Sequence, residues 1–301
     1  MALFDAFAQV GKKEDITDVI SNISPTKTPF QTSIGSMKVW NTLFQWQEDS
    51  LATASGTNYQ IEGFTASDAT LIPTVMRSNY TQIFQKTIKV SSTADAVSTY
   101  GRAKEAAYQM AKAAAEVKRD LEMTLLGNAT QTAVAGASGA TARQMAGVTA
   151  QIAAGALTKT GATSNPITEA FLLANLQACY SNGADPTTIS VTPADSLVVA
   201  GFAAATGRLR DLNDGPSGQT IVNAVTVYVS PFGQQSVVLN RFQYQYETII
   251  YDPGMWKLAT LRPWTRETLA KTGDNLMMMI VGEFSLMHKN QLATGRIQKS
   301  A

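Results

Sequence analysis

GRAKEAAYQMAKAAAEVKRDLEMTLL, residues 101–126, is the stretch that decides the fold of this 301-residue chain. It contains no proline, and no glycine after Gly101, while apolar residues recur every three or four positions. This spacing predicts a helix with one apolar stripe, about 39 Å long. Because the stripe is narrow and rich in alanine, a flat partner such as a sheet can approach it closely. The stripe consists of Ala103, Ala107, Met110, Ala114, Val117, Leu121 and Leu125.

A strand-like segment, Met37–Glu48, lies upstream of this helix. Its rings at Trp40, Phe44 and Trp46 share a parity, so an extended strand would place all three on one side. Residues 79–90 form a second alternating segment, and a stretch rich in Ser, Thr and Gly separates the two. Together they predict a long antiparallel hairpin whose connection is too long for a tight turn.

The three rings raise the question of what they pack against. Residues 52–69 are mostly Thr, Ser, Ala, Asn and Gly, and they offer no local core. Either the rings face a sheet later in the same chain, or they face another copy of the protein. Composition alone leaves both possibilities open.

The two ends of the chain give simpler patterns. Glu14–Asn22 predicts about two helical turns, which Pro25 and then Pro29 would end. Residues 276–289, LMMMIVGEFSLMHK, predict one long strand near the C-terminus.

A compact α+β domain is predicted between Pro166 and Pro253. Ile167–Asn182 has helical spacing, and a second helix is predicted near Ser196–Ala205. Four strand runs accompany them, namely ISVTP, AVTVYVSP, QQSVVLN and ETIIYD. The preceding residues 129–165 are rich in Ala, Gly and Thr and predict a loop with one short helix.

Composition narrows the class of protein. The net charge is +1, which demands neither nucleic acid nor a membrane surface as a partner. Only 16% of residues are charged, against about 25% in ordinary soluble domains, which suggests a surface that neighbours cover. The single Cys179 excludes an intrachain disulfide, and the longest apolar run, Leu276–Val281, is too short to cross a membrane. We expect a soluble protein made in the cytosol.

No catalytic, cofactor-binding or metal-binding residues emerge from the sequence. His288 is the only histidine and has no accompanying G-x-S-x-G motif, so it reads as a surface or strand-end residue. Cys179 reads as a small buried residue on a helix. Asp211–Gly215 fails as a calcium loop because Arg210 and Leu212 occupy ligand positions, and Gly215–Thr220 reads as a connecting loop. We therefore predict a protein that is not an enzyme and uses no cofactor.

Several segments together resemble the major head proteins of one group of tailed bacteriophages. They are EDITDVISNISPTKTPFQTSIG at 14–35, FQWQEDSL at 44–51, and RSNYTQIFQKTIKVSSTADAVSTYGRAKEAAYQMAKAAAEVKRDLE at 77–122. VYVSPFGQQSVVLNR at 227–241, LRPW at 261–264 and AKTGDNLMMMIVGEFSLMHKNQLATGRI at 270–297 continue the match over nearly the whole chain. The motifs are structural rather than catalytic, and their order and spacing carry the resemblance.

The resemblance implies the α+β fold of the Hong Kong 97 (HK-97) type capsid subunit. Such a subunit has an N-terminal arm, an extended β-hairpin loop (E-loop), a peripheral P-domain with a long spine helix, and an inserted axial A-domain. The implied parts are Met1–Ser36 for the arm, Met37–Asn79 for the E-loop, Tyr80–Pro166 with Pro253–Ala301 for the P-domain, residues 101–126 for the spine helix, and Ile167–Asp252 for the A-domain.

The implied function is that of a structural major capsid protein. It would self-assemble into hexamers and pentamers of an icosahedral head shell that encloses phage double-stranded DNA, without sequence-specific contact. A portal protein would be a further partner, and scaffolding or decoration proteins remain open. The protein would reside in the virion after assembly in the bacterial cytoplasm, with no membrane partner. Trp40, Phe44 and Trp46 become subunit-interface candidates that help to anchor the hairpin base.

Two alternatives stay open from the sequence. An encapsulin-like compartment uses the same subunit plan around cargo enzymes. An enzyme or a carbohydrate-binding module with exposed Trp and Tyr belongs to a different class, and a fold alone does not exclude it.

Overall fold

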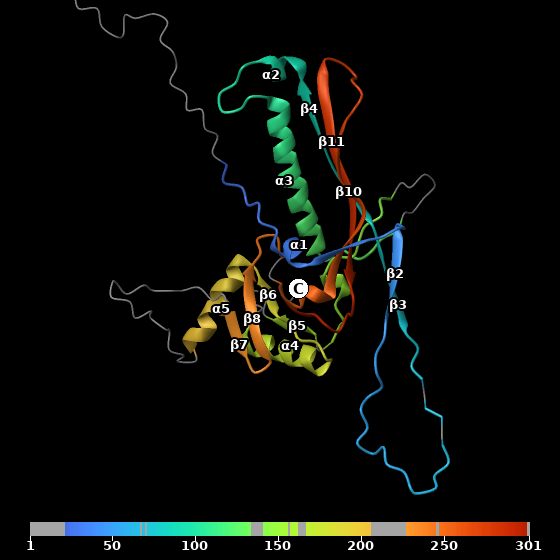
Figure 1. Cartoon of the computed structure of the whole chain (residues 1–301). Helices are drawn as coiled ribbons and strands as arrows, with labels where there is room; N and C mark the ends of the chain where they lie inside the picture. The colour runs from blue at the N-terminus through green and yellow to red at the C-terminus, as the bar shows by residue number, and fades with distance from the viewer. Residues whose placement is uncertain are drawn as a thin grey trace, which may run out of the picture.

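The computed structural model describes residues 22–66, 68–69, 71–133, 141–155, 157–161, 167–205, 227–244 and 247–299. Except for Asn22, the helix predicted over Glu14–Asn22 lies outside these residues. Residues 211–220, which contain the rejected calcium-loop motif and the connecting loop, also lie outside them. Figure 1 shows three parts in the described chain: a long helix standing beside a tall β-hairpin, a mixed unit below them, and a thin loop extending away from both.

The long helix, α3, runs from Glu105 to Leu125 and packs on a four-stranded sheet. The strand order is β1-β10-β11-β4, with β10 and β11 forming the tall antiparallel hairpin. β4 pairs antiparallel with β11, and β1 adds a short parallel edge to β10. The bounds are β1 Gly35–Lys38, β4 Gln82–Ser91, β10 Trp256–Thr268 and β11 Asn275–His288.

The apolar stripe of α3 was predicted correctly at its large residues and wrongly at its alanines. Met110, Val117, Leu121 and Leu125 are buried. Ala106 and Ala113 occupy the buried alanine positions, whereas the predicted Ala103, Ala107 and Ala114 are exposed. Runs of alanine make neighbouring positions equivalent in the sequence, so only large side chains fix the buried face.

The helix begins four residues later than predicted because two other groups set its start. Gly101 has a φ of 75°, a left-handed conformation that breaks the helical path. Asp95, in the short helix α2 (Ser92–Ala96), accepts a hydrogen bond of 3.0 Å from the backbone N–H of Ala106. This contact replaces a side-chain cap, which Lys104 at the helix start does not provide.

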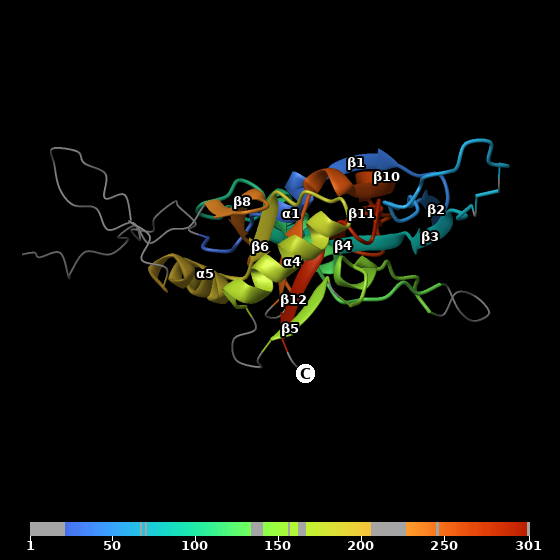
Figure 2. The same ribbon diagram turned by 90° about the horizontal axis from the view of Figure 1, so that it is seen from below.

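The mixed unit is a six-stranded sheet with two helices, in the order β5-β12-β9-β6-β8-β7. Both predicted helices and all four predicted strand runs are present in it, and Figure 2 shows α4 and α5 beside the sheet when the molecule is seen from below. β5 and β12 belong to this sheet, although both lie outside residues 167–252 in the sequence. The sheet is therefore not formed by one continuous segment of the chain. The bounds are β5 Thr158–Gly161, α4 Glu169–Ser181, β6 Thr188–Val191, α5 Pro193–Ala205, β7 Val227–Ser230, β8 Gly233–Leu239, β9 Thr248–Tyr251 and β12 Gly295–Lys299.

β10 is the main element that the sequence analysis missed. Its outer half is exposed and rich in Arg, Thr and Glu, so it lacks the apolar alternation of a half-buried strand. It also contains Pro263, which ordinarily argues against a strand. The strand tolerates this proline because the pairing with β11 shifts register between Arg262 and Thr265.

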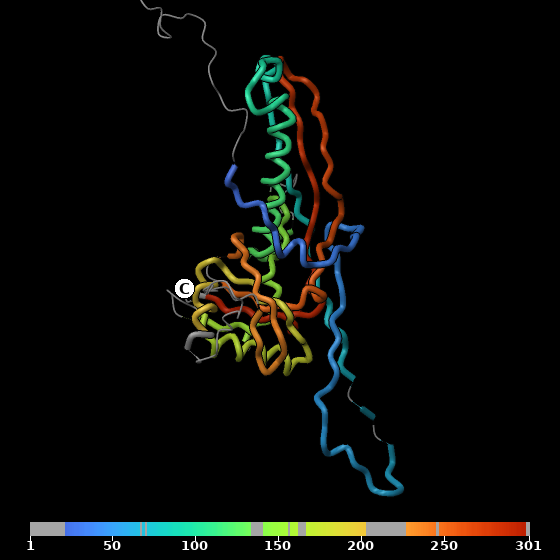
Figure 3. Tube along the Cα trace, turned by 60° about the vertical axis from the view of Figure 1, so that its left-hand side comes forward, coloured from blue at the N-terminus to red at the C-terminus, as the bar shows by residue number. Residues whose placement is uncertain are grey.

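The predicted hairpin exists, but each of its two segments divides between two sheets. β2 (Leu43–Glu48) pairs antiparallel with β3 (Val75–Tyr80), with Leu43 opposite Tyr80 and Glu48 opposite Val75. β1 precedes β2 and pairs with β10 instead, while β4 follows β3 and pairs with β11. In Figure 3 the β2–β3 ribbon leaves the body and ends in a long open loop.

Candidate assembly surfaces

The loop between β2 and β3, residues 49–74, has no covering layer. Every described residue in it is exposed, and none lies in a helix or strand. Its exposed side chains include large apolar residues, with Leu51 at 97% and Ile61 at 78% of full exposure. Large apolar side chains that nothing covers are typical of an interaction surface. The large exposed members are Leu51, Tyr59, Ile61, Phe64, Leu71 and Ile72.

The loop is also uniform in charge. It contains Asp49, Glu62 and Asp68 but no lysine or arginine. A surface that receives this loop would therefore combine apolar contacts with positive charge.

Unlike the loop, the hairpin base, defined here as β2, β3 and Thr81, is tied firmly to the body. Phe44 is buried and stacks on Trp46 with 5.5 Å between ring centroids. Both pack against β1 and β10 in a small core that includes Val39 and Ala259. For Phe44 and Trp46, the partner is thus a sheet in the same chain.

Trp40 does not share their face, so the prediction that all three rings lie on one side was wrong for this residue. It lies in the turn between β1 and β2, where strand alternation does not apply, and its side chain is 82% exposed. The Lys38 ammonium lies 4.0 Å from the centroid of its ring. Of the three interface candidates, Trp40 is the one whose ring faces solvent in the isolated chain.

A buried carboxylate holds the hairpin base in place. Glu283 on β11 accepts hydrogen bonds from the Thr81 hydroxyl at 2.6 Å and from Arg262 Nε at 3.1 Å, and it forms an ion pair with Arg143. Burial alone would raise the pKa of Glu283, but the hydrogen bonds from Thr81 and the two arginines together hold it below its ordinary value. β11 is thereby joined to three other chain segments at the point where β3 becomes β4.

A buried amide makes a second connection at the same place. Asn79, at the end of β3, donates from Nδ2 to the carbonyl oxygen of Leu286 at 2.7 Å. Its Oδ1 accepts from the backbone N–H of Ala146 at 2.9 Å. Because Asn79 is fully buried, the loss of either contact would leave a polar group without water.

A different buried carboxylate holds a short helix near the beginning of the described chain. Glu122, in the last turn of α3, accepts from the backbone N–H groups of Phe30 and Gln31, each at 2.8 Å. These residues open the short helix α1 (Pro29–Ser33), whose N-cap residue makes no side-chain cap. Asn240, next to β8, donates to the same carboxylate at 2.7 Å. Burial raises the pKa of Glu122 despite these bonds. The carboxylate therefore joins α1, α3 and the six-stranded unit.

His288 and Cys179 both take structural positions. His288 ends β11 as predicted, but it is buried rather than on the surface, with its ring stacked 3.8 Å from that of Trp256. Burial lowers its pKa to about 4. Cys179 is buried on α4, and burial raises the pKa of its thiol to about 12. Among the described residues no group of His, Cys, Asp and Glu could hold a metal ion.

The helices that the structure describes include none long and apolar enough to cross a membrane.

The chain matches known proteins over nearly its full length. A family model described as SU10 major capsid protein matches residues 4–301. The major capsid protein of Escherichia phage Phieco32 is 32% identical to the chain, over 97% of the chain and 96% of the relative.

Solved structures give the same result at the level of fold. A capsid protein of a native GTA particle superposes with a TM-score of 0.66 at 12% identity, covering 98% of both chains. A chain from Gordonia phage Cozz gives a TM-score of 0.65 at 13% identity, covering 98% of this chain and 93% of that one. A chain from Microbacterium phage Oxtober96 gives 0.65 at 12% identity, covering 98% of each. At these identities the likeness shows the fold alone.

Proposed function

Because the chain belongs to the SU10 major capsid protein family, we propose that its exposed loop, residues 49–74, becomes ordered by lying on a neighbouring copy in the shell. The protein is a major capsid protein of a tailed phage and forms capsid shells, as predicted. Its α+β fold is of the HK-97 type, and the protein is part of the virion shell. The encapsulin-like alternative is not favoured.

One observation carries the proposal for the loop. In a single subunit all its described residues are exposed, including six large apolar side chains. Fixing each residue in one conformation costs about 1–2 kcal/mol, and burial of apolar area is the main term that offsets such a cost. Since the chain itself buries none of these side chains, the surface that does so belongs to another molecule.

The hairpin base and the arm have separate roles in this proposal. Phe44 and Trp46 set the direction in which the loop leaves the body, while the exposed ring of Trp40 contacts the neighbouring copy. Glu122 sets the direction of the arm through its bonds to Phe30 and Gln31. The Gly- and Ser-containing crossing at Ser50–Ala69 acts as the hinge that lets identical subunits adopt different bends.

We extend the proposal to the whole particle. Hexamers and pentamers form an icosahedral shell in the bacterial cytoplasm, and the shell encloses double-stranded DNA without sequence-specific contacts. A portal protein completes it. This role requires no catalysis, and the buried Glu122 and Glu283 serve it by holding parts of the chain together.

A shortened hairpin tests the role of the loop. Residues 50–73 are replaced by a two-residue Asn-Gly turn, which the pairing of β2 with β3 up to Glu48 and Val75 can accommodate. We expect a folded subunit with an unchanged melting temperature that forms no shells. A control variant keeps the loop at full length and exchanges only Ser, Thr and Asn residues among themselves, and it should still assemble. Negative-stain microscopy and size-exclusion chromatography give the result, and normal shells from the shortened chain would refute the proposal.

A further inference from the structure

The two ends of the hairpin base are attached to the body in different ways. At the near end Phe44 is buried against β1 and β10, and Asn79, which pairs with it, donates a hydrogen bond to the carbonyl oxygen of Leu286. At the far end, where the loop begins, Val75 and Met76 are exposed. A stiff hairpin that is held at one end only can pivot about that end. Its direction is fixed only if the far end is also attached.

Glu48, the last residue of β2, makes this second attachment. Its Oε1 accepts a hydrogen bond from the backbone N–H of Gln291 at 3.1 Å, and its Oε2 accepts one from Arg77 Nε at 2.9 Å. Arg77 lies diagonally across the hairpin on β3, so this ion pair orients the carboxylate. Within the described chain, the bond to Gln291 is the only hydrogen bond that joins residues 43–48 or 75–78 to the body.

The turn that receives Glu48 is fixed by contacts of its own. Residues 289–294 connect β11 to β12, and Gln291 lies among them. The carbonyl oxygen of Gln291 accepts a hydrogen bond from the backbone N–H of Ala153 at 3.1 Å. The next residue, Leu292, packs against the main hydrophobic core. A bond to this turn is therefore a bond to the rigid part of the subunit.

Packing around the Glu48 contact is incomplete. Two clefts, of about 380 Å³ and about 130 Å³, lie between the hairpin and the body, and Glu48, Arg77 and Gln291 line both of them. Trp46 lines the larger cleft, and its buried indole N–H has no hydrogen-bond partner within the described chain. Because side chains leave this space unfilled, the polar contacts of Glu48 hold the far end where close packing does not.

We propose that Glu48 is a positioning residue for the loop: through Arg77 and the N–H of Gln291, it fixes the direction in which residues 49–74 leave the body. Phe44 and Glu48 lie roughly 13 Å apart along β2, and the loop extends at most about 40 Å further. A displacement of about 1 Å at Glu48 therefore moves the tip of the loop by up to about 4 Å. The inference rests on the proposed function, in which the loop lies on a neighbouring copy, and it names the group that sets the loop's direction.

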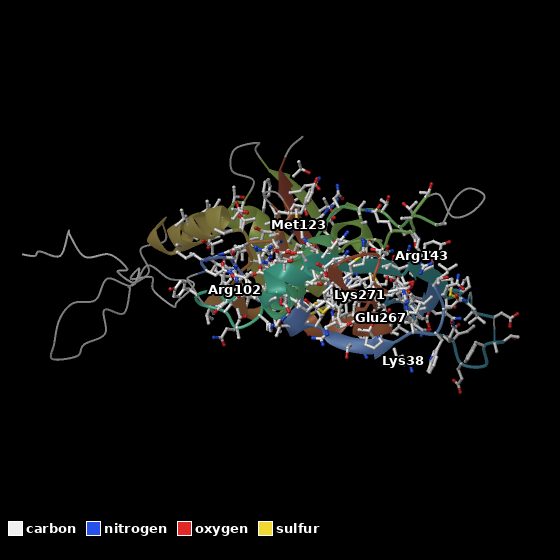
Figure 4. All side chains as sticks on the ribbon, turned by 90° about the horizontal axis from the view of Figure 1, so that it is seen from above. Lys38, Arg102, Met123, Arg143, Glu267 and Lys271 are labelled. Atoms are coloured by element: carbon white, nitrogen blue, oxygen red, sulfur yellow. The ribbon has the colours of Figure 1, made fainter. Side chains whose placement is uncertain are left out.

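Distances within the unassembled subunit test this role directly. Spin labels on Gln47→Cys and Met123→Cys report the separation of the hairpin from α3 by pulsed electron paramagnetic resonance. Both positions are exposed, whereas the native Cys179 is buried. In Figure 4 Met123 lies on the opposite side of α3 from Glu267 of β10, so its label stays clear of the sheet.

Two neighbouring carboxylates provide the variant and its matched control in this labelled chain. Glu48→Ala should broaden the distribution of distances about twofold, because the hairpin can then pivot about its near end. Asp49→Ala removes an exposed carboxylate whose one hydrogen bond in the described chain is local, to the N–H of Ser50 at 2.9 Å. It should leave the distribution unchanged. Equal distributions in the two variants would overturn the proposal.

A conservative variant and the melting temperature separate positioning from a merely structural role. Glu48→Gln keeps an oxygen that can accept from the N–H of Gln291 but loses the charge that pairs with Arg77, so its distribution should lie between those of the wild type and Glu48→Ala. The melting temperatures of all these chains should agree within about 1 °C, since the hairpin can loosen without unfolding of the core. A lower melting temperature with an unchanged distribution would show that Glu48 only stabilises the fold.

Assembly then shows whether the direction of the loop matters to the shell. If the freed hairpin spends about one fifth of its time in the required direction, the apparent affinity between subunits falls about fivefold. The protein concentration at which shells form should rise by that factor in Glu48→Ala and stay unchanged in Asp49→Ala, as measured by light scattering. Broader distances without such a rise, or an equal rise in both variants, would overturn the inference. The proposed function is judged separately, because it fails only if the chain with the shortened hairpin forms normal shells.

Discussion

The hairpin base and the loop that it supports belong to one β-hairpin, but the base packs against the body whereas the loop is exposed to solvent. The base places Phe44, Asn79 and Thr81 inside the molecule, where each contacts a residue distant in sequence. The loop places every described side chain in solvent. The subunit therefore fixes where the loop leaves the body but buries none of the loop's described side chains. Under the proposed function, a neighbour has to order only the loop.

The largest expected effect contrasts two rings of the same ribbon. Phe44→Ala removes a buried ring and should lower the free energy of unfolding by about 3 kcal/mol. Trp40→Ala should leave it unchanged, because Trp40 is exposed and lies outside the strand. Urea unfolding of the isolated subunits measures both values. If the two variants lost a similar free energy of unfolding, the assignment of Phe44 to the core and of Trp40 to the surface would be wrong.

The next effect concerns the buried amide at the end of β3. Asn79→Ala should lower the free energy of unfolding by about 2 kcal/mol, since the N–H of Ala146 loses its partner and the carbonyl of Leu286 keeps only the 3.3 Å bond from Gln151 Nε2. Asn58→Ala, in the exposed loop, is the matched control and should have no effect. Thermal melts of the two proteins compare them directly. If Asn79→Ala melts at the temperature of the wild type, the hydrogen bonds of Asn79 do not stabilise the hairpin base.

The third effect depends on pH and concerns Glu283, the buried carboxylate that holds the hairpin base through Thr81. The folded-state pKa of Glu283 is lowered, so its contribution to stability is present above the ordinary glutamate range and is lost as the pH falls below it. Glu283→Gln should therefore cost about 1–2 kcal/mol near neutral pH and progressively less in acid. Glu62→Gln, in the exposed loop, is the control and should leave the melting temperature at neutral pH unchanged. Melting temperatures at several pH values measure this, and parallel curves for wild type and Glu283→Gln would contradict it.

Sequence reasoning found the parts of the molecule that rest on local pattern. The long helix, both helices of the mixed unit and its four strand runs follow from periodicity, and all are present. It missed β10, whose exposed residues and proline hide its long pairing with β11. It also placed Trp40 on the same face as Phe44. That prediction failed because the alternation of a strand does not continue into the turn in which Trp40 lies.

The sequence also could not identify the buried polar residues Glu122 and Glu283 as structural, because a local pattern does not show contacts between distant segments. Glu122 and Glu283 look in the sequence like ordinary charged residues of a helix and a strand. Their partners lie far away in the chain: Glu122 bonds Phe30 and Asn240, and Glu283 bonds Thr81. One sign was present, since Glu122 falls beside Leu121 and Leu125 on the apolar side of the helix. A charge on a buried face indicates a partner without naming it.

The smallest effect on the isolated subunit belongs to the loop and has the largest consequence for the shell. Tyr59→Ser with Ile61→Ser should change the free energy of unfolding by less than about 0.5 kcal/mol, because both side chains are already in solvent. The same two changes should raise the protein concentration at which shells first form, since under the proposed function each removes apolar area that a second copy buries. Light scattering against concentration measures that threshold. A lower melting temperature of the subunit with an unchanged threshold would reverse the assignment, and the loop would then belong to the subunit's own fold.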